Sequence, residues 1–235
     1  MRRDGGRGSG AAQDAVGRGM KRPSCILWDR DTTPVDGWAA IQHGLNAAFR
    51  EFGMPEWDRT TVLARVRGSL RDTFPAMFGS GWERARDVFY AGVRSCHLDV
   101  LSPMPGALIA IEAAAAIGPQ GVISNKQGPL LRAEAAHLGW TPHFVTLIGA
   151  GDAVADKPDP APFVMALSAC GTFAGPEVWY VGDTALDMQA ARAAGCTAVL
   201  LGNAAHDGGV AKVQPDLAFA DGHAFAAALG SLARS

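Results

Sequence analysis

Short apolar runs alternate with segments of helical periodicity along most of this chain. The runs have strand length and are apolar nearly throughout, and they occupy 24–28, 121–125, 144–148, 178–181 and 197–201. Apolar residues recur at helical spacing over 107–117, 130–138, 162–170, 186–194 and 223–232. Strands that are apolar on both sides are typical of a parallel sheet with helices on both faces. The alternation therefore predicts an α/β fold built on a Rossmann-like parallel sheet.

One long stretch after the first apolar run shows helical periodicity only. Apolar residues recur there at Ile41, Leu45, Phe49 and Phe52, and further helical texture covers 62–71 and 82–93. We therefore expect residues 37–100 to form an all-helical cap domain that is inserted after the first strand. Residues 22–36 and 101–235 would then form the sheet domain.

The first residues differ from the rest in composition. Residues 1–21 are rich in Gly and Arg and contain no apolar run, which predicts a flexible leader and not a secretory signal. No apolar run in the chain approaches the ~18 residues of a membrane-spanning helix. We therefore expect a cytoplasmic protein that has no membrane partner.

Charge and cysteine content narrow the function classes. The 235 residues include 21 Lys and Arg against 23 Asp and Glu, a formal net charge of −2. This balance argues against a protein that binds nucleic acid or anionic membranes. The four cysteines form no CxxC pair, and the six histidines show no metal-binding spacing. Neither a zinc site nor a disulfide framework is therefore expected.

Polar residues stand at the ends of four of the predicted strands or in the loops that follow them. They are Asp29 with Asp31, Ser124-Asn125-Lys126, Asp156-Lys157-Pro158, and Asp183 with Asp187. The four-residue spacing of the last pair predicts that both lie on one face of the first helical turn. Ligands of parallel sheets bind beyond the carboxyl ends of the strands. Clustered carboxylates suit Mg²⁺, and a lysine beside hydroxyl and N–H donors suits a phosphoryl group. Their shared position predicts a single active site.

In these motifs the chain resembles the haloacid dehalogenase-like hydrolases, in the subgroup with a helical cap after the first motif. The matching stretches are Asp29-Arg30-Asp31-Thr32-Thr33, Ile123-Ser124-Asn125, Lys157-Pro158 and Gly182-Asp183-Thr184-Ala185-Leu186-Asp187. The resemblance covers about 22–235 and is closest to phosphoglycolate-phosphatase-like members. It implies a Mg²⁺-dependent phosphatase whose partner is a small phosphorylated metabolite.

The resemblance implies a role for each residue of the first motif. Asp29 would attack phosphorus and form an aspartyl-phosphate. Asp31 would give a proton to the leaving oxygen and then take one from water, and Thr33 would help to hold Asp31. In the dehalogenase branch the position of Asp31 is not acidic, so an Asp here resembles the phosphatases and phosphomutases.

The other motifs would bind the metal ion and the phosphoryl group. Mg²⁺ would be held by Asp29, the backbone carbonyl of Asp31, Asp183, and Asp187 directly or through water. Ser124, the backbone N–H of Asn125 and Lys157 would neutralise the phosphoryl oxygens.

Two positions depart from the family's usual pattern. Thr32 stands where members usually have Gly, and Pro34 stands where they have an apolar residue. A positive φ would cost the β-branched Thr32 ~1 kcal/mol or more, and Pro34 pushes Thr33 toward an extended conformation. A catalytically weak phosphate-binding member therefore stays open beside the phosphatase, and the sequence does not exclude a phosphomutase of the same family.

A local cationic stretch lies in the predicted cap. It consists of Arg65, Arg67 and Arg71 with Gly68 between them. Arg67, Gly68 and Arg71 could meet a carboxylate or a second phosphate of the substrate. A solvated helix face is the plainer interpretation of the same residues. The sequence leaves the oligomeric state, monomer or homodimer, open.

Overall fold

A six-stranded parallel sheet forms the larger part of the molecule. The computed structural model describes residues 20–30, 35–66 and 70–234, with the backbone alone at 70–72. The strand order is β5-β4-β1-β6-β7-β8, and every neighbouring pair in this sheet is parallel. The strands are β1 (Cys25–Trp28), β4 (Gln120–Gln127), β5 (Thr146–Ala150), β6 (Val178–Gly182), β7 (Thr197–Leu201) and β8 (Leu217–Phe219).

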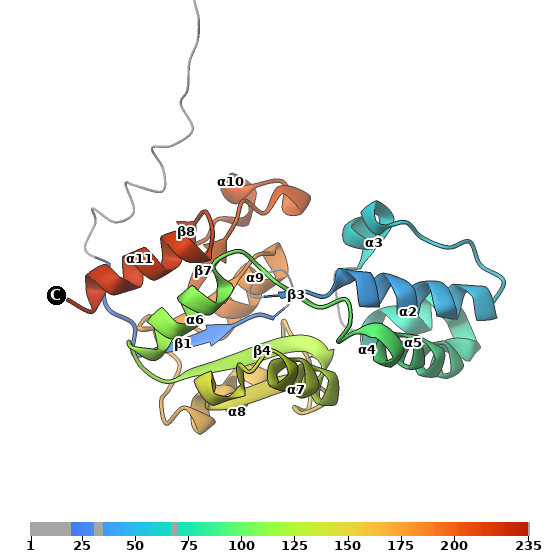
Figure 1. The fold of residues 1–235 in the computed structure, drawn as a ribbon, viewed down its shortest axis with the longest axis horizontal. Coiled ribbons are helices and arrows are strands. Elements are labelled where there is room, and N and C mark those ends of the chain that lie inside the picture. Colours follow the sequence, from blue (N-terminus) through green and yellow to red (C-terminus); the bar gives the residue numbers. More distant parts are fainter. Residues whose placement is uncertain (1–19, 31–34, 67–69, 235) are drawn as a thin grey trace, which may run out of the picture.

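Helices cover both faces of this sheet (Figure 1). They are α6 (Ala107–Ala115), α7 (Gly128–His137), α8 (Ala161–Ala169), α9 (Ala185–Ala193), α10 (Val210–Val213) and α11 (Gly222–Leu232), with short 3-10 turns η2 (Thr141–His143) and η3 (Ala205–Asp207). Successive residues of β1 face opposite sides, so Ile26 and Trp28 pack with α6 and α11. Cys25 and Leu27 pack with α8 and α9. This arrangement confirms the predicted α/β fold.

A block of helices, which we call the cap, stands beyond one end of the sheet (Figure 1). Its elements are α2 (Trp38–Glu51), α3 (Arg59–Arg65), α4 (Leu70–Phe78), η1 (Gly79–Gly81) and α5 (Trp82–Cys96). The cap has its own hydrophobic cluster, in which Phe49, Phe74 and Phe89 are almost fully buried. The chain enters the cap through β2 (Val35–Asp36) and returns through β3 (Ser102–Pro103), and these two short strands pair antiparallel.

The structure differs from the sequence-based expectations in several short segments of the described chain. The predicted helical stretch over 62–71 is divided, because α3 ends at Arg65 and Val66 is extended, with φ −85° and ψ 101°. Asp58 caps α3 by accepting the backbone N–H of Thr61, which starts this helix earlier than expected. The β2–β3 ribbon and β8 have two or three residues per strand, too few to give a periodicity.

Two further expectations concern the N-terminal leader and membrane-spanning helices. Of the predicted leader, residues 1–19 lie outside the described part of the chain. No helix between residues 20 and 234, the undescribed gaps aside, combines the length and apolarity that crossing a membrane requires.

Candidate active site

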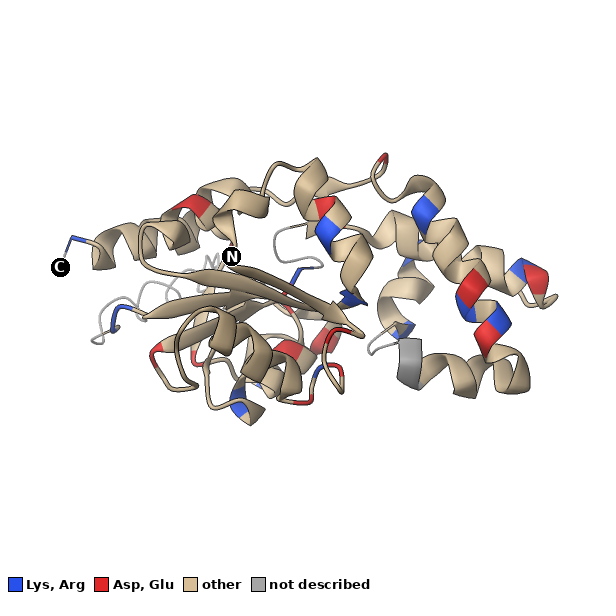
Figure 2. Ribbon diagram, turned by 90° about the horizontal axis from the view of Figure 1, so that it is seen from below, with Lys and Arg blue, Asp and Glu red and all other residues tan. Residues whose placement is uncertain are grey.

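The described residues of the predicted polar set meet at the carboxyl ends of four adjacent strands, β5, β4, β1 and β6. Asp29 directly follows β1, and its backbone N–H donates to the Val181 carbonyl at 2.7 Å, which continues the strand pairing by one residue. Asp183 directly follows β6. Figure 2 shows charged residues gathered where this edge of the sheet faces the cap. The strand order therefore places residues from distant parts of the sequence at one edge.

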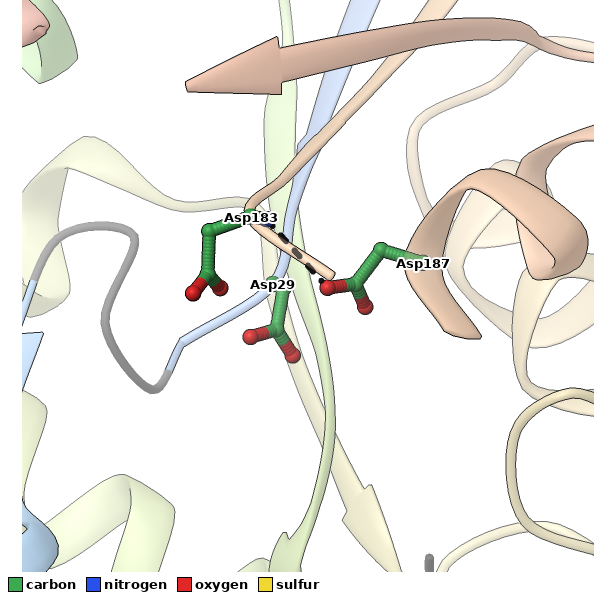
Figure 3. A group of neighbouring side chains, drawn as sticks. All are labelled: Asp29, Asp183 and Asp187. Atoms are coloured by element: carbon green, nitrogen blue, oxygen red, sulfur yellow. Dashed lines mark hydrogen bonds between the residues drawn. The ribbon is translucent and has the colours of Figure 1, made fainter. Parts of the chain in front are cut away.

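Three carboxylates form an acidic group at this edge (Figure 3). One oxygen atom from each of Asp29, Asp183 and Asp187 lies within 4.8 Å of the others. Asp29 and Asp187 are buried, and Asp183 is half-buried. The three residues offer carboxylate oxygens as metal ligands, and oxygen ligands suit a hard divalent cation such as Mg²⁺. Without a cation between them, such closely spaced carboxylates would repel one another.

Asp187 is held in place by the first turn of α9. Thr184 and Asp187 form a reciprocal cap, in which each side chain accepts the backbone N–H of the other. The Thr184 hydroxyl also donates to Asp187 Oδ2 at 2.6 Å. Thr184 is the N-cap of α9, so Asp183 lies one residue before the helix begins. The expectation that Asp183 and Asp187 share the first helical turn is therefore wrong. Asp183 instead reaches the acidic group from the loop after β6.

Lys157 connects the acidic group to the loop after β5. Its ammonium group donates to Asp29 Oδ1 at 2.5 Å and to Asp187 Oδ1 at 2.9 Å. Burial alone would lower the pKa of Lys157, but the nearby Asp187 and Asp29 carboxylates outweigh it and raise this pKa well above its usual value. Lys157 therefore stays charged and offsets part of the repulsion between the acids.

Tyr180, which the sequence interpretation did not single out, is the third partner of Lys157. The Lys157 ammonium donates to the Tyr180 hydroxyl at 2.6 Å, and this hydroxyl donates to the Ile123 carbonyl at 3.1 Å. Burial raises the pKa of Tyr180 well above its usual value, with nearby Lys157 acting in the opposite direction. The phenol stays protonated, so it donates to Ile123 while it accepts from Lys157. An apolar strand motif such as Val178–Gly182 gave no signal for this role.

The end of β4 supplies the remaining predicted polar groups. The pairing register of β4 with β5 shifts between Ile123 and Gln127, so Ser124 and Asn125 lie in an irregular part of β4. The Asn125 side chain binds the backbone of Lys157 twice, donating to its carbonyl at 3.0 Å and accepting its N–H at 2.9 Å. Asn125 therefore positions the Lys157 loop through its side chain. Ser124 Oγ accepts the backbone N–H of Lys126 at 3.1 Å.

A second buried ionic group lies next to this strand end, and the sequence interpretation missed it. Glu134 of α7 is 1% exposed and forms an ion pair with Arg30, the residue after Asp29. Both Glu134 oxygens also accept from Lys126 Nζ, at 2.8 and 3.0 Å. His97 Nδ1, just beyond α5, lies 2.8 Å from Glu134 Oε1. No motif could have shown this group, because its members come from four separate segments.

Several predicted site residues lie outside the described part of the chain. These are Asp31, Thr33, Arg67 and Gly68. Arg71 lies in α4, but its side chain is not among those described.

A pocket of about 340 Å³ opens between the acidic group and the cap. Its sheet side includes Asp29, Ser124, Asn125, Lys157 and Asp187. Its cap side includes residues of α2 and α5. The structure thus places these five predicted polar residues on one wall of a pocket that a small molecule can enter.

Comparison with known proteins finds one family. Residues 26–201 match the family model described as haloacid dehalogenase-like hydrolase. A phosphoglycolate phosphatase from Chromobacterium violaceum is 28% identical over 193 residues, which are 78% of this chain and 86% of the relative. A phosphoglycolate phosphatase from Yersinia pestis is 35% identical over 185 residues, 74% of this chain and 78% of the relative.

Solved structures share the fold. The crystal structure of a predicted phosphoglycolate phosphatase from Haemophilus somnus 129PT superposes with a TM-score of 0.74 at 22% sequence identity. The superposition covers 91% of this chain and 99% of that chain, so the cap and the sheet both have counterparts there.

Proposed function

Because this chain belongs to the haloacid dehalogenase-like hydrolase family, we propose that it is a magnesium-dependent phosphatase for a small phosphorylated metabolite. The main support is that three acidic side chains and one lysine meet at one place, and that Asp29, Asp187 and Lys157 line a pocket there. The relatives named phosphoglycolate phosphatase make 2-phosphoglycolate the first substrate to assay.

Asp29 is the proposed nucleophile. Its carboxylate attacks phosphorus, so a bond to Asp29 forms as the bond to the ester oxygen breaks. Asp31 donates the proton that the leaving alkoxide takes up. Asp31 then accepts a proton from a water molecule that attacks the same phosphorus, and this releases inorganic phosphate and restores Asp29. The role of Asp31, and that of Thr33 in holding it, rest on their place in the motif.

Asp29 and Asp183 are the proposed side-chain ligands of Mg²⁺, together with the backbone carbonyl of Asp31. Asp187 would act through water, because its two oxygens already accept from Lys157 and from Thr184. When bound, the ion supplies positive charge that offsets repulsion between the Asp29 carboxylate and the phosphoryl oxygens.

The phosphoryl oxygens would be bound by Lys157, the Ser124 hydroxyl and the backbone N–H of Asn125. Lys157 already contacts Asp29 at 2.5 Å, so its ammonium group is close to any phosphoryl group attached there. Ser124 and Asn125 belong to the neighbouring strand end. Donors that are fixed before the substrate arrives stabilise developing negative charge without first reorganising.

Replacing the nucleophile tests this function. Asp29→Asn keeps the size of the side chain but removes its nucleophilic charge, so hydrolysis of p-nitrophenyl phosphate should fall by more than about 10³-fold. Circular dichroism should show unchanged folding. The control Asp87→Asn removes an exposed carboxylate on α5 and should keep wild-type activity. Turnover that survives in Asp29→Asn would contradict the proposed mechanism.

A further inference from the structure

The pocket beside the acidic group has two chemically different ends. The sheet contributes polar residues, among them Asp29, Ser124 and Lys157. The described lining residues from the cap are apolar or aromatic, namely Trp38, Ile41, Val66, Phe89, Tyr90 and Val93. A phosphomonoester whose phosphoryl group lies at Asp29 would point its alcohol portion toward the cap end.

Charged side chains line only the sheet end, as far as the described residues extend, and both lysines there are already paired with carboxylates. Lys157 contacts Asp29 and Asp187. Lys126 contacts Glu134, and both of these side chains are buried. None of the described residues that line the cap end carries a charge. Beside the described cap residues, a second anionic group on the substrate would therefore meet apolar side chains.

We infer that the preferred substrate carries an uncharged, apolar alcohol group, such as a ring or a branched alkyl chain; this rests on the proposed phosphatase function. A carboxylate placed among these six described side chains would lose its hydration without gaining a cationic partner from them, which costs free energy. An apolar group at the same place would leave water and gain contacts, which is favourable.

The size of the whole pocket and the aromatic pair at its cap end agree with this class of substrate. The pocket volume of about 340 Å³ lies within the roughly 300–1,000 Å³ of pockets that hold drug-sized ligands. The rings of Phe89 and Tyr90 meet edge to face, with centroids 5.1 Å apart at an interplanar angle of 73°. A third ring could join such a pair in the edge-to-face or offset geometry that aromatic groups prefer.

Rates with three esters of similar leaving-group chemistry test the inference. Benzyl phosphate and isobutyl phosphate carry apolar alcohols, and 2-phosphoglycolate carries a carboxylate. With Mg²⁺ present, kcat/KM should be at least about 10-fold higher for the two apolar esters than for 2-phosphoglycolate. A preference for 2-phosphoglycolate would overturn the inference while leaving the phosphatase function in place. Absence of turnover with all three esters would overturn the proposed function and the inference together.

A pair of matched variants locates the effect in the cap. Ile41 is half-buried and lines the pocket, so Ile41→Ala should lower kcat/KM by roughly 10-fold for benzyl phosphate and by clearly less for methyl phosphate. Val88 is also half-buried in the cap but does not line the pocket. Val88→Ala should leave both rates unchanged. Equal losses for benzyl and methyl phosphate in Ile41→Ala would contradict the inference.

The cationic stretch of the cap, which includes Arg67 and Arg71, leads to the opposite expected result if it binds the substrate. If Arg67 or Arg71 receives a substrate carboxylate, 2-phosphoglycolate will be preferred, and Arg67→Ala or Arg71→Ala will abolish that preference. The inference predicts instead that neither substitution changes the ratio of the benzyl phosphate and 2-phosphoglycolate rates.

Discussion

The ammonium group of Lys157 lies between two carboxylates and a phenol, and the three partners come from different parts of the sheet edge. Asp29 follows β1, Tyr180 belongs to β6, and Asp187 belongs to α9. The Asn125 side chain fixes the backbone on either side of the same residue. An ammonium group with this many hydrogen-bond partners can keep one position, so it does not have to be repositioned in each reaction cycle.

The first prediction concerns the hydroxyl of Tyr180. Tyr180→Phe should keep the fold, because the ring still packs against Phe163 with centroids 4.8 Å apart. It should lower the free energy of unfolding by ~1–2 kcal/mol. If the freed Lys157 shifts by 1 Å, kcat can fall by up to ~100-fold. Denaturant unfolding and steady-state kinetics measure the two effects.

A matched variant separates positioning from stability. Thr197→Val removes a hydroxyl that donates to the Pro176 carbonyl at 2.6 Å, away from the pocket. It should cost a similar ~1 kcal/mol without changing kcat. A Tyr180→Phe enzyme with wild-type kcat would show that the hydroxyl has no positioning role.

The second prediction concerns the buried carboxylate of Glu134. Glu134→Ala leaves Arg30 and Lys126 in the protein interior without their shared anion, so the free energy of unfolding should fall by about 3–5 kcal/mol. The exposed Glu112 on α6 is the control, and Glu112→Ala should change stability by less than ~0.5 kcal/mol. Equal denaturation midpoints for the two variants would show that the buried group is not structurally important.

At the scale of elements, the site depends on how β6 leads into α9. Gly182 ends β6, and a Cβ atom on it would lie 2.4 Å from the Asp187 Cβ and 2.5 Å from its Cγ. Because Asp187 is fixed by the Thr184 cap and by Lys157, it has little room to move aside. The close approach of strand and helix therefore requires glycine at this position.

The third prediction follows from that close approach. Gly182→Ala should displace Asp187 and lower kcat by roughly 10–100-fold, since small misplacements at a reacting centre cost about that much. Gly230→Ala is the control, because the added Cβ meets nothing closer than 3.7 Å and alanine favours helix α11. Steady-state kinetics on both variants test the claim, which fails if Gly182→Ala is as active as Gly230→Ala.

The long elements could be predicted from the sequence, and the short ones could not. The apolar run at 197–201 coincides with β7, and the helical period over 186–194 lies one residue from α9. β8 has three residues, too few for a pattern. Asp183 was expected inside a helix because spacing alone does not show that Thr184 is the cap. Helix boundaries depend on such side-chain hydrogen bonds, which periodicity does not report.

At the scale of the whole molecule, the sheet and the cap have separate hydrophobic clusters, and residues of both line the pocket beside Asp29. The strand-end rule placed the polar residues of the sheet edge correctly, since parallel strands bring their carboxyl ends to one side. The apolar side chains at the cap end of the pocket and the Glu134 group could not be foreseen. They arise from contacts between elements such as α2, α5 and α7, whose relative placement no local pattern encodes.

The fourth prediction concerns Mg²⁺ and the stability of the folded protein. An ion that binds only the folded state adds about 2.7 kcal/mol at a concentration 100 times its Kd. Mg²⁺ should therefore raise Tm in wild type, and Asp183→Asn should remove most of this rise. Asp152→Asn, which alters a carboxylate paired with Arg132 outside the pocket, should keep it. A Tm that does not respond to Mg²⁺ in wild type would contradict the assignment of the acidic group.

The most direct test of the central claim is to trap the phosphorylated enzyme. Wild-type protein that is turning over substrate with Mg²⁺ would be quenched in acid, digested and examined by mass spectrometry. The account predicts the added mass of one phosphoryl group on the peptide that contains Asp29, and its absence from the Asp29→Asn protein. A phosphoryl group on another residue, or phosphate release by the Asp29→Asn protein at the wild-type rate, would contradict it.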